Sequence, residues 1–372
     1  MEKDVKQVLT ELINIPTYDG IKSGHPIISY LEDAFSSCCE VLKLKDEMNK
    51  THFLIGVNTH LNNISNAFMF SGHIDTVPET ENHKALASFR NGYIEGLGSA
   101  DMKGFVASLF CNIKNFQRSS KPIIISLTSD EETDFYGIET VLSEMKKKNL
   151  ALSAVIVGEP TSSNIALSHR GNSIFVGKII GKACHSSTPE QGINAINLSM
   201  EAISDIESCI VKHRNNASIC ITNINGGKAC NVVPDECKTT ISVRAKNHNS
   251  LNEVAYDLNE IYKKVGEKAV KYEINNVFNI PPFECFGVLM RELFSSKNNI
   301  PFNCASEAGF IQGVYENADI AIYGPGDNNC IHREGERMDI VELTNYSSSL
   351  PKVVERYYNL QKERDCLHEP QL

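Results

Sequence analysis

Short apolar runs that alternate with helical patterns constrain the fold of this chain most. The runs at residues 67–70, 123–127 and 154–157 are each short enough to be a buried strand. Helical patterns lie between them, at 102–116 and 136–145. This alternation is typical of an α/β domain with a mostly parallel sheet.

The pattern changes after about residue 170. Strands and helices then follow in the order β-α-β-β-α-β, at 172–180, 193–213, 217–224, 238–243, 251–265 and 269–274. That order is the ferredoxin-like pattern. Two prolines at 281–282 end the segment. The alternation of strands and helices then continues with a strand at 320–323 and a helix at 340–360. We therefore predict a discontinuous α/β catalytic domain at 1–170 and 283–372, with a ferredoxin-like α+β domain inserted at 171–282.

Composition and charge narrow the class of protein. With 372 residues, two domains are expected, and a formal net charge of −10 argues against a nucleic-acid partner. The first residues lack the apolar core of a secretory signal, and no apolar run is long enough to span a bilayer. We expect a cytoplasmic protein with no membrane contact. The 12 cysteines are scattered without a CxxC pair, so we expect them to be reduced.

Histidine or carboxylate side chains follow each predicted strand of the α/β domain. His73 follows the run at 67–70, Glu131 and Glu132 follow 123–127, Glu159 follows 154–157, and His332 comes after 320–323. Ligands of open α/β sheets bind beyond the carboxyl ends of the strands. We therefore expect these side chains to meet at one place.

Such a group of acids needs a counter-charge, because buried carboxylates repel one another. Asp101 adds a fourth carboxylate, and two imidazoles with three of the carboxylates, Asp101 bridging, can coordinate two divalent ions. This ligand set suits zinc and also accepts cobalt or manganese. Each residue alone has a simpler explanation: Asp101 could be a helix N-cap, and residues 130–132 an acidic turn. The recurrence of histidine or carboxylate side chains after four predicted strands favours the metal site.

Several motifs of the chain resemble one metallopeptidase family. The motifs are residues 71–78 (SGHIDTVP), 96–104 (GLGSADMKG), 129–132 (SDEE), 158–161 (GEPT), 181–195 and 231–234 (NVVP). The family contains acetylornithine deacetylase, succinyl-diaminopimelate desuccinylase, aminoacylases and folate-cleaving zinc carboxypeptidases. The resemblance runs from about residue 15 to the final helix, and it implies the same inserted-domain architecture.

The resemblance also implies which residues bind the metal ions. One ion would be held by His73 and Glu159, the other by Glu132 and His332, and Asp101 would bridge them. The charged stretch after His332 departs from the usual continuation of the family, so the surroundings of this ligand are less well defined.

Further roles are implied by position. Asp75 would accept a hydrogen bond from His73, and Glu131 would be the general base for a water between the ions. In the inserted domain, His185 would stabilise the oxyanion in the partner subunit's site, which implies a homodimer. Asn231 and Arg244 would hold the carboxylate of a small N-acyl amino acid. There are simpler interpretations: His185 could be a histidine at the start of a helix, and Arg244 could form a surface salt bridge.

The deacetylases of the family resemble this chain most in three segments, 96–105, 304–311 and 323–326 with His332. This branch implies removal of the acetyl group from N-acetyl-L-ornithine, a step of arginine biosynthesis. Residues 169–171 also resemble an acetylcitrulline deacetylase, so the accepted side chain stays open. Glu307 could contact a cationic substrate side chain, or it could cap the segment that begins at residue 308.

Three other functions are alternatives to the deacetylase. A di- or tripeptidase of the same family would use identical metal chemistry. A metal-free hydrolase could use Cys184 or a serine with His185, but no Gly-x-Ser-x-Gly elbow supports it. A non-catalytic relative is disfavoured because Glu131, Asp101 and His332 are all present.

Overall fold

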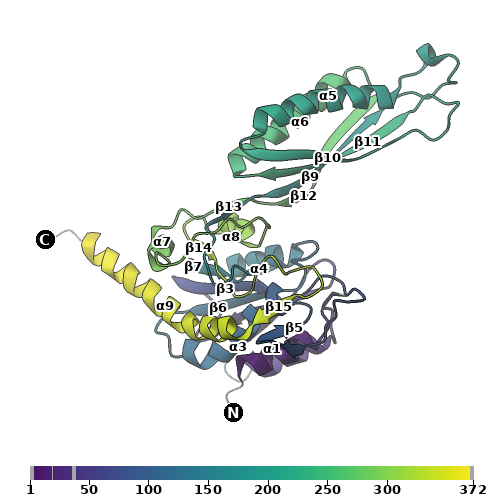
Figure 1. The fold of residues 1–372 in the computed structure, drawn as a ribbon. Helices are drawn as coiled ribbons and strands as arrows, with labels where there is room; N and C mark the ends of the chain where they lie inside the picture. The colour runs from purple at the N-terminus through teal and green to yellow at the C-terminus, as the bar shows by residue number, and fades with distance from the viewer. Residues whose placement is uncertain (1–3, 19, 36–38, 369–372) are drawn as a thin grey trace. The chain divides into compact units, whose positions relative to one another are not determined.

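The computed structural model describes residues 4–18, 20–35 and 39–368 (Figure 1). Two compact units divide the chain: the first comprises Met1–Ser168, Cys285–Phe302 and Ser306–Leu372, and the second comprises His169–Glu284 and Asn303–Ala305. The sequence predicted boundaries at 171 and 282, within a few residues of these. Cys38 lies outside the described residues, so the redox state expected for all the cysteines stays a prediction. No helix in the described part of the chain is long and apolar enough to cross a membrane.

A six-stranded sheet forms the centre of the first unit. Its strands, in spatial order, are β1 (Glu40–Lys45), β2 (Thr51–Gly56), β6 (Ile123–Thr128), β3 (Ala67–His73), β7 (Leu152–Val157) and β14 (Asp319–Ile322). The four strands from β6 to β14 run parallel, and β1 and β2 extend the sheet antiparallel. Every residue of β2, β3 and β6 is buried, which explains why these strands are mostly apolar and do not alternate between apolar and polar residues. The predicted α/β architecture is confirmed.

Helices cover both faces of this sheet (Figure 1). On one face α1 (Val5–Ile13), α3 (Gly104–Phe116) and α9 (Ile340–His368) pack together, and on the other α4 (Tyr136–Lys147) packs with α8 (Ala308–Val314). The buried residues of α4 include Ile138, Val141, Leu142 and Met145, whose spacing is that of one helix face. The same unit contains α2 (Pro26–Phe35), α7 (Val288–Leu293), the irregular turn Ser99–Lys103, and a small sheet of β4 (Ser88–Arg90), β5 (Tyr93–Glu95) and β15 (Arg337–Asp339).

The second unit is a four-stranded antiparallel sheet with two helices on one face. Its elements are β9 (Asn172–Ile180), α5 (Ala195–His213), β10 (Ala217–Gly226), β11 (Glu236–Ala245), α6 (His248–Gly266) and β12 (Lys271–Ile280). The spatial order β10-β11-β9-β12 is that of the ferredoxin-like fold predicted from the sequence. The side chains of Asn194 and Asn247 cap the two helices by accepting from backbone N–H groups. Short elements lie at Ser168–His169 (β8), Pro189–Gln191 and Phe283–Glu284 (β13).

Candidate metal centre

Three neighbouring parallel strands end beside the candidate site. His73 is the last residue of β3, Glu131 and Glu132 follow the end of β6, and Glu159 follows β7. All three strands run in one direction, so their carboxyl ends lie at the same edge of the sheet. His73 and Glu159 are buried, with 1% and 5% of their surface exposed.

Asp101 lies between two histidines. Its Oδ1 is 3.1 Å from Nε2 of His73, and its Oδ2 is 3.2 Å from Nε2 of His332. Nε2 of His332 is also 2.7 Å from Oε1 of Glu132. One oxygen directed at each histidine is the arrangement that a bridging carboxylate requires. Since the carboxylate faces these histidines, Asp101 is not the N-cap that the sequence left open.

Two sets of potential ligand atoms overlap at His73. His73, Asp101 and Glu132 form one set, and His73, Glu131 and Glu159 form the other; within each set all atoms lie within 4.8 Å of one another. Oε2 of Glu131 is 3.9 Å from Nε2 of His73. The geometry therefore groups Glu131 with the predicted ligands His73 and Glu159.

The electrostatics of the cluster fit a bound cation. Burial raises the pKa of Glu131 well above its usual range, and the neighbouring Glu159 raises it further. Burial likewise raises the pKa of Glu159, whose Oε1 is buried with no hydrogen-bond partner. An orphaned buried acceptor is costly, and a divalent ion would satisfy it. The oxygen and nitrogen donors present thus fit the predicted pair of ions.

Asp75 supports the cluster differently from the expectation. Nδ1 of His73 lies 3.0 Å from the backbone carbonyl of Asp75, which leaves Nε2 directed at Asp101, while the Asp75 carboxylate is more distant at 3.5 Å. That carboxylate accepts instead from the backbone N–H groups of Glu131 at 3.3 Å and Glu132 at 3.0 Å. Asp75 therefore fixes both the histidine and the backbone of the two adjacent glutamates.

Glu336 is a supporting residue that the sequence analysis missed. Its carboxylate is 2% exposed. It accepts hydrogen bonds from the backbone N–H groups of Gly98 (3.0 Å), Ala100 (2.9 Å) and Asp101 (3.1 Å), and it lies 2.9 Å from Nε2 of His83. Gly98 adopts a φ of 77°, the left-handed region that favours glycine. One buried acid thus holds the turn that presents Asp101. Only its place four residues after His332, in the charged stretch noted above, hinted at this role.

Glu307 lies beneath the cluster rather than at its surface. It is 1% exposed, and its two oxygens accept from the hydroxyl groups of Ser71 and Thr128, in β3 and β6. Burial raises its pKa to about 7, against the lowering effect of these two hydrogen bonds. Both oxygens already accept a hydrogen bond within the buried interior, and the contact with a substrate ammonium stays a prediction. Glu307 makes no capping hydrogen bond to α8.

The remaining predicted residues belong to the second unit. His185 is exposed, with Nδ1 2.7 Å from the Ser187 hydroxyl, and Ser186 N–H donates to the Asn231 carbonyl at 3.0 Å. Arg244 is exposed on β11, opposite Ser218 of β10. His185 and Asn231 therefore lie side by side, and the substrate roles of all three residues stay predictions.

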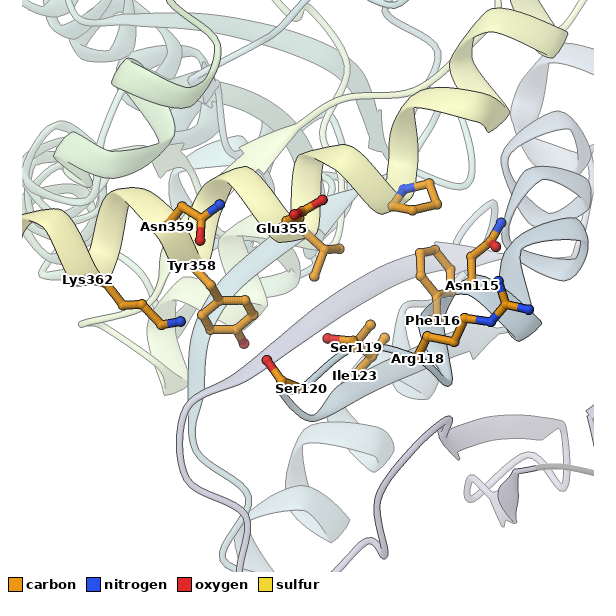
Figure 2. A pocket seen from close by; sticks show the side chains of 12 residues that line it. Asn115, Phe116, Arg118, Ser119, Ser120, Ile123, Glu355, Tyr358, Asn359 and Lys362 are labelled. Atoms are coloured by element: carbon orange, nitrogen blue, oxygen red, sulfur yellow. The ribbon is translucent and has the colours of Figure 1, made fainter.

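A pocket elsewhere in the first unit is not part of the site. Figure 2 shows it between the end of α3 and the helix α9, with a volume of about 380 Å³. Its charged groups are Arg118, Glu355 and Lys362, and Ile123, the first residue of β6, also lines it. Because the candidate metal centre lies at the carboxyl ends of the strands, this pocket is at the other end of β6.

Comparison with known proteins identifies the family. Residues 69–357 match the model of peptidase family M20/M25/M40. A protein of Buchnera aphidicola named acetylornithine deacetylase is 25% identical over 380 residues, which cover 94% of this chain and 97% of that protein. A tripeptidase of Staphylococcus aureus has the same fold, with a TM-score of 0.74, 21% identity and coverage of 96% and 98%. A dinuclear metal binding peptidase of Bacillus subtilis matches with a TM-score of 0.66, 14% identity and coverage of 96% and 99%. The chain therefore belongs to peptidase family M20/M25/M40 and is a metal-dependent amide hydrolase.

Proposed function

We propose that this enzyme removes the acetyl group from N-acetyl-L-ornithine and releases L-ornithine and acetate. The observation that carries the hydrolytic chemistry is the placement of Asp101 between His73 and His332, with Glu131 beside them. The choice of substrate is supported by the relatives named acetylornithine deacetylase, which align with most of the chain. A cytoplasmic place in arginine biosynthesis goes with that substrate.

Two divalent ions fit the donors: His73 and Glu159 would hold one, Glu132 and His332 would hold the other, and Asp101 would be shared. Zinc is the first choice for imidazole and carboxylate ligands, and cobalt or manganese would also bind. When bound, the ions would polarise the scissile carbonyl and lower the pKa of a nearby water.

Glu131 is the proton carrier of the proposed reaction. Its carboxylate takes a proton from the attacking water, whose oxygen bonds to the acetyl carbonyl carbon. The C–N bond then breaks, and Glu131 returns the proton to the departing ornithine amine. The backbone of Glu131 is held by Asp75, so the base keeps its position through both proton transfers.

We infer that His185 donates to the oxyanion and that Arg244 and Asn231 hold the substrate carboxylate. By the family resemblance, His185 would act in the partner's site of a homodimer. Mixing Glu131→Gln with His185→Ala protein tests this: restored activity after subunit exchange supports action in trans, whereas no restoration in verified mixed dimers contradicts it.

The deciding assay measures release of free amine from N-acetyl-L-ornithine by purified protein. We expect turnover that is lost after chelation and restored by zinc, and that is lowered by about 10²–10⁴-fold in Glu131→Gln protein. N-acetylcitrulline and a tripeptide serve as competing substrates. Faster cleavage of the tripeptide by the zinc-loaded enzyme would replace the deacetylase assignment with a peptidase, and activity that survives chelation would contradict the metal chemistry itself.

A further inference from the structure

Two facing pairs of polar side chains lie between the helices of the second unit. Cys209 and His213 are one helical turn apart on α5, and Glu253 and Asp257 are one turn apart on α6. Side chains at this spacing share one face of a helix, and the two helices pack against each other. Each helix therefore presents a pair of potential ligands to the other.

The atoms of this group are close enough to share one ion. Sγ of Cys209, a ring nitrogen of His213 and a carboxylate oxygen of Asp257 all lie within 4.8 Å of one another. Nε2 of His213 is 2.7 Å from Oδ2 of Asp257. Cys209 and His213 are 5% and 3% exposed, whereas the Asp257 side chain is 18% exposed and leaves access from solvent.

We propose that Cys209, His213 and Asp257 bind a single zinc ion that joins α5 to α6. A thiolate, an imidazole and a carboxylate are the ligand types that zinc takes, and a water completes the tetrahedron. Nε2 of His213 becomes the ligand, because it already faces Asp257. Nδ1 then carries the ring proton on the side of Glu253, whose Oε2 is 4.0 Å away and would have to move closer to accept it.

The Lys212 ammonium and the thiol proton of Cys209 compete with the ion for its ligands. Nζ of Lys212 lies 2.6 Å from Oδ2 of Asp257, but this side chain is 62% exposed and can turn into solvent. Burial raises the pKa of the Cys209 thiol to about 11, so the ion has to displace the thiol proton. Without an ion, the group is a hydrogen-bonded His213–Asp257 pair that links the helices.

A thiolate ligand distinguishes this site experimentally from the catalytic one. None of the proposed catalytic ligands is a cysteine, so a thiolate bound to metal can be detected independently of the deacetylase chemistry. We would strip the full chain with a chelator, add Co²⁺, and record the near-ultraviolet absorption of thiolate-to-cobalt charge transfer. Cys209→Ser is the test variant. Cys237→Ser is the matched control, because Cys237 is equally buried in the same unit, at 1% exposure.

The expected result is a charge-transfer band in the wild type and in Cys237→Ser that is absent from Cys209→Ser. Zn²⁺ should remove the band by competition, and zinc-loaded Cys209→Ser should hold one ion fewer per chain than the wild type. His213→Gln, which keeps the thiol, should also lose the band. Absence of the band in folded, cobalt-saturated wild type would overturn the proposal, as would its persistence in Cys209→Ser. Neither result depends on whether the enzyme hydrolyses N-acetyl-L-ornithine.

Discussion

Replacement of Glu336 tests whether a buried acid far along the chain holds the metal-bridging turn. Its Oε1 accepts from the N–H groups of Ala100 and Asp101, and its Oε2 accepts from Gly98 N–H and lies 2.9 Å from His83 Nε2. In Glu336→Gln the amide oxygen can replace Oε1, but the NH₂ group then faces the donors that Oε2 had satisfied. The variant therefore keeps the shape of the side chain and loses half of its acceptors.

The expected decrease in the free energy of unfolding follows from the lost hydrogen bonds. A hydrogen bond to a charged group contributes about 1.5–3 kcal/mol, and an unsatisfied buried donor costs about 1–3 kcal/mol. Two lost bonds at the low end of this range predict that Glu336→Gln lowers the free energy of unfolding by about 3 kcal/mol. A displaced Asp101 would also weaken metal binding, by about 10–100-fold if Glu336 acts as outer-shell partners of metal ligands do.

The assay is urea unfolding of metal-stripped protein, followed by metal titration of the folded variant. Glu334→Gln is the control, because Glu334 is an exposed acid two residues away and should change stability by less than about 0.5 kcal/mol. If Glu336→Gln matched this control in both stability and metal affinity, the inference that Glu336 holds the Asp101 turn would be refuted.

Three further perturbations have defined outcomes. Glu131→Gln should lower kcat by about 10²–10⁴-fold while the ions stay bound, and loss of metal together with activity would instead make Glu131 a ligand. Gly158→Ala should destabilise the protein by about 1–3 kcal/mol in urea, because a Cβ there would lie 2.2 Å from the Phe105 ring, and unchanged stability would contradict this. Burial lowers the pKa of His169 to about 4, so the unfolded state binds the proton more readily, and the stability from this group is present above about pH 6.5 and is lost as the pH falls towards 4. Between pH 7 and 5, wild type should therefore lose about 2 kcal/mol more than His169→Gln, and equal losses in urea unfolding would count against this.

Local patterns in the sequence predicted the sheet and the residues at its strand ends. The apolar runs mark β3, β6 and β7, and the side chains that follow each run form the cluster. Boundaries were less accurate: the helix predicted at 102–116 begins at Gly104, and the final helix continues through Pro351 to His368.

The supporting acids could not be predicted, because their partners are distant in sequence. Glu336 is 235 residues from Asp101, and Glu307 is 236 residues from Ser71. No periodicity or motif reports such a pairing, since it exists only after the sheet and its helices have packed. For Asp75 a supporting role was predicted from the resemblance, but its contacts with the backbone of Glu131 and Glu132, across 56 and 57 residues, were not.

The hydrogen-bond partners of the buried acids separate those that support the site from those that act in it. A buried carboxylate needs donors, and three acids here find them in the protein: Asp75 and Glu336 in backbone N–H groups, and Glu307 in two hydroxyls. Glu159 differs, because its Oε1 is buried without a partner. The first three acids are stabilised by donors of the fold, and each positions the residues that it contacts. An acid left without donors is stable only when an ion or a substrate supplies the missing positive charge, and Glu159 is placed where the predicted ions would supply it.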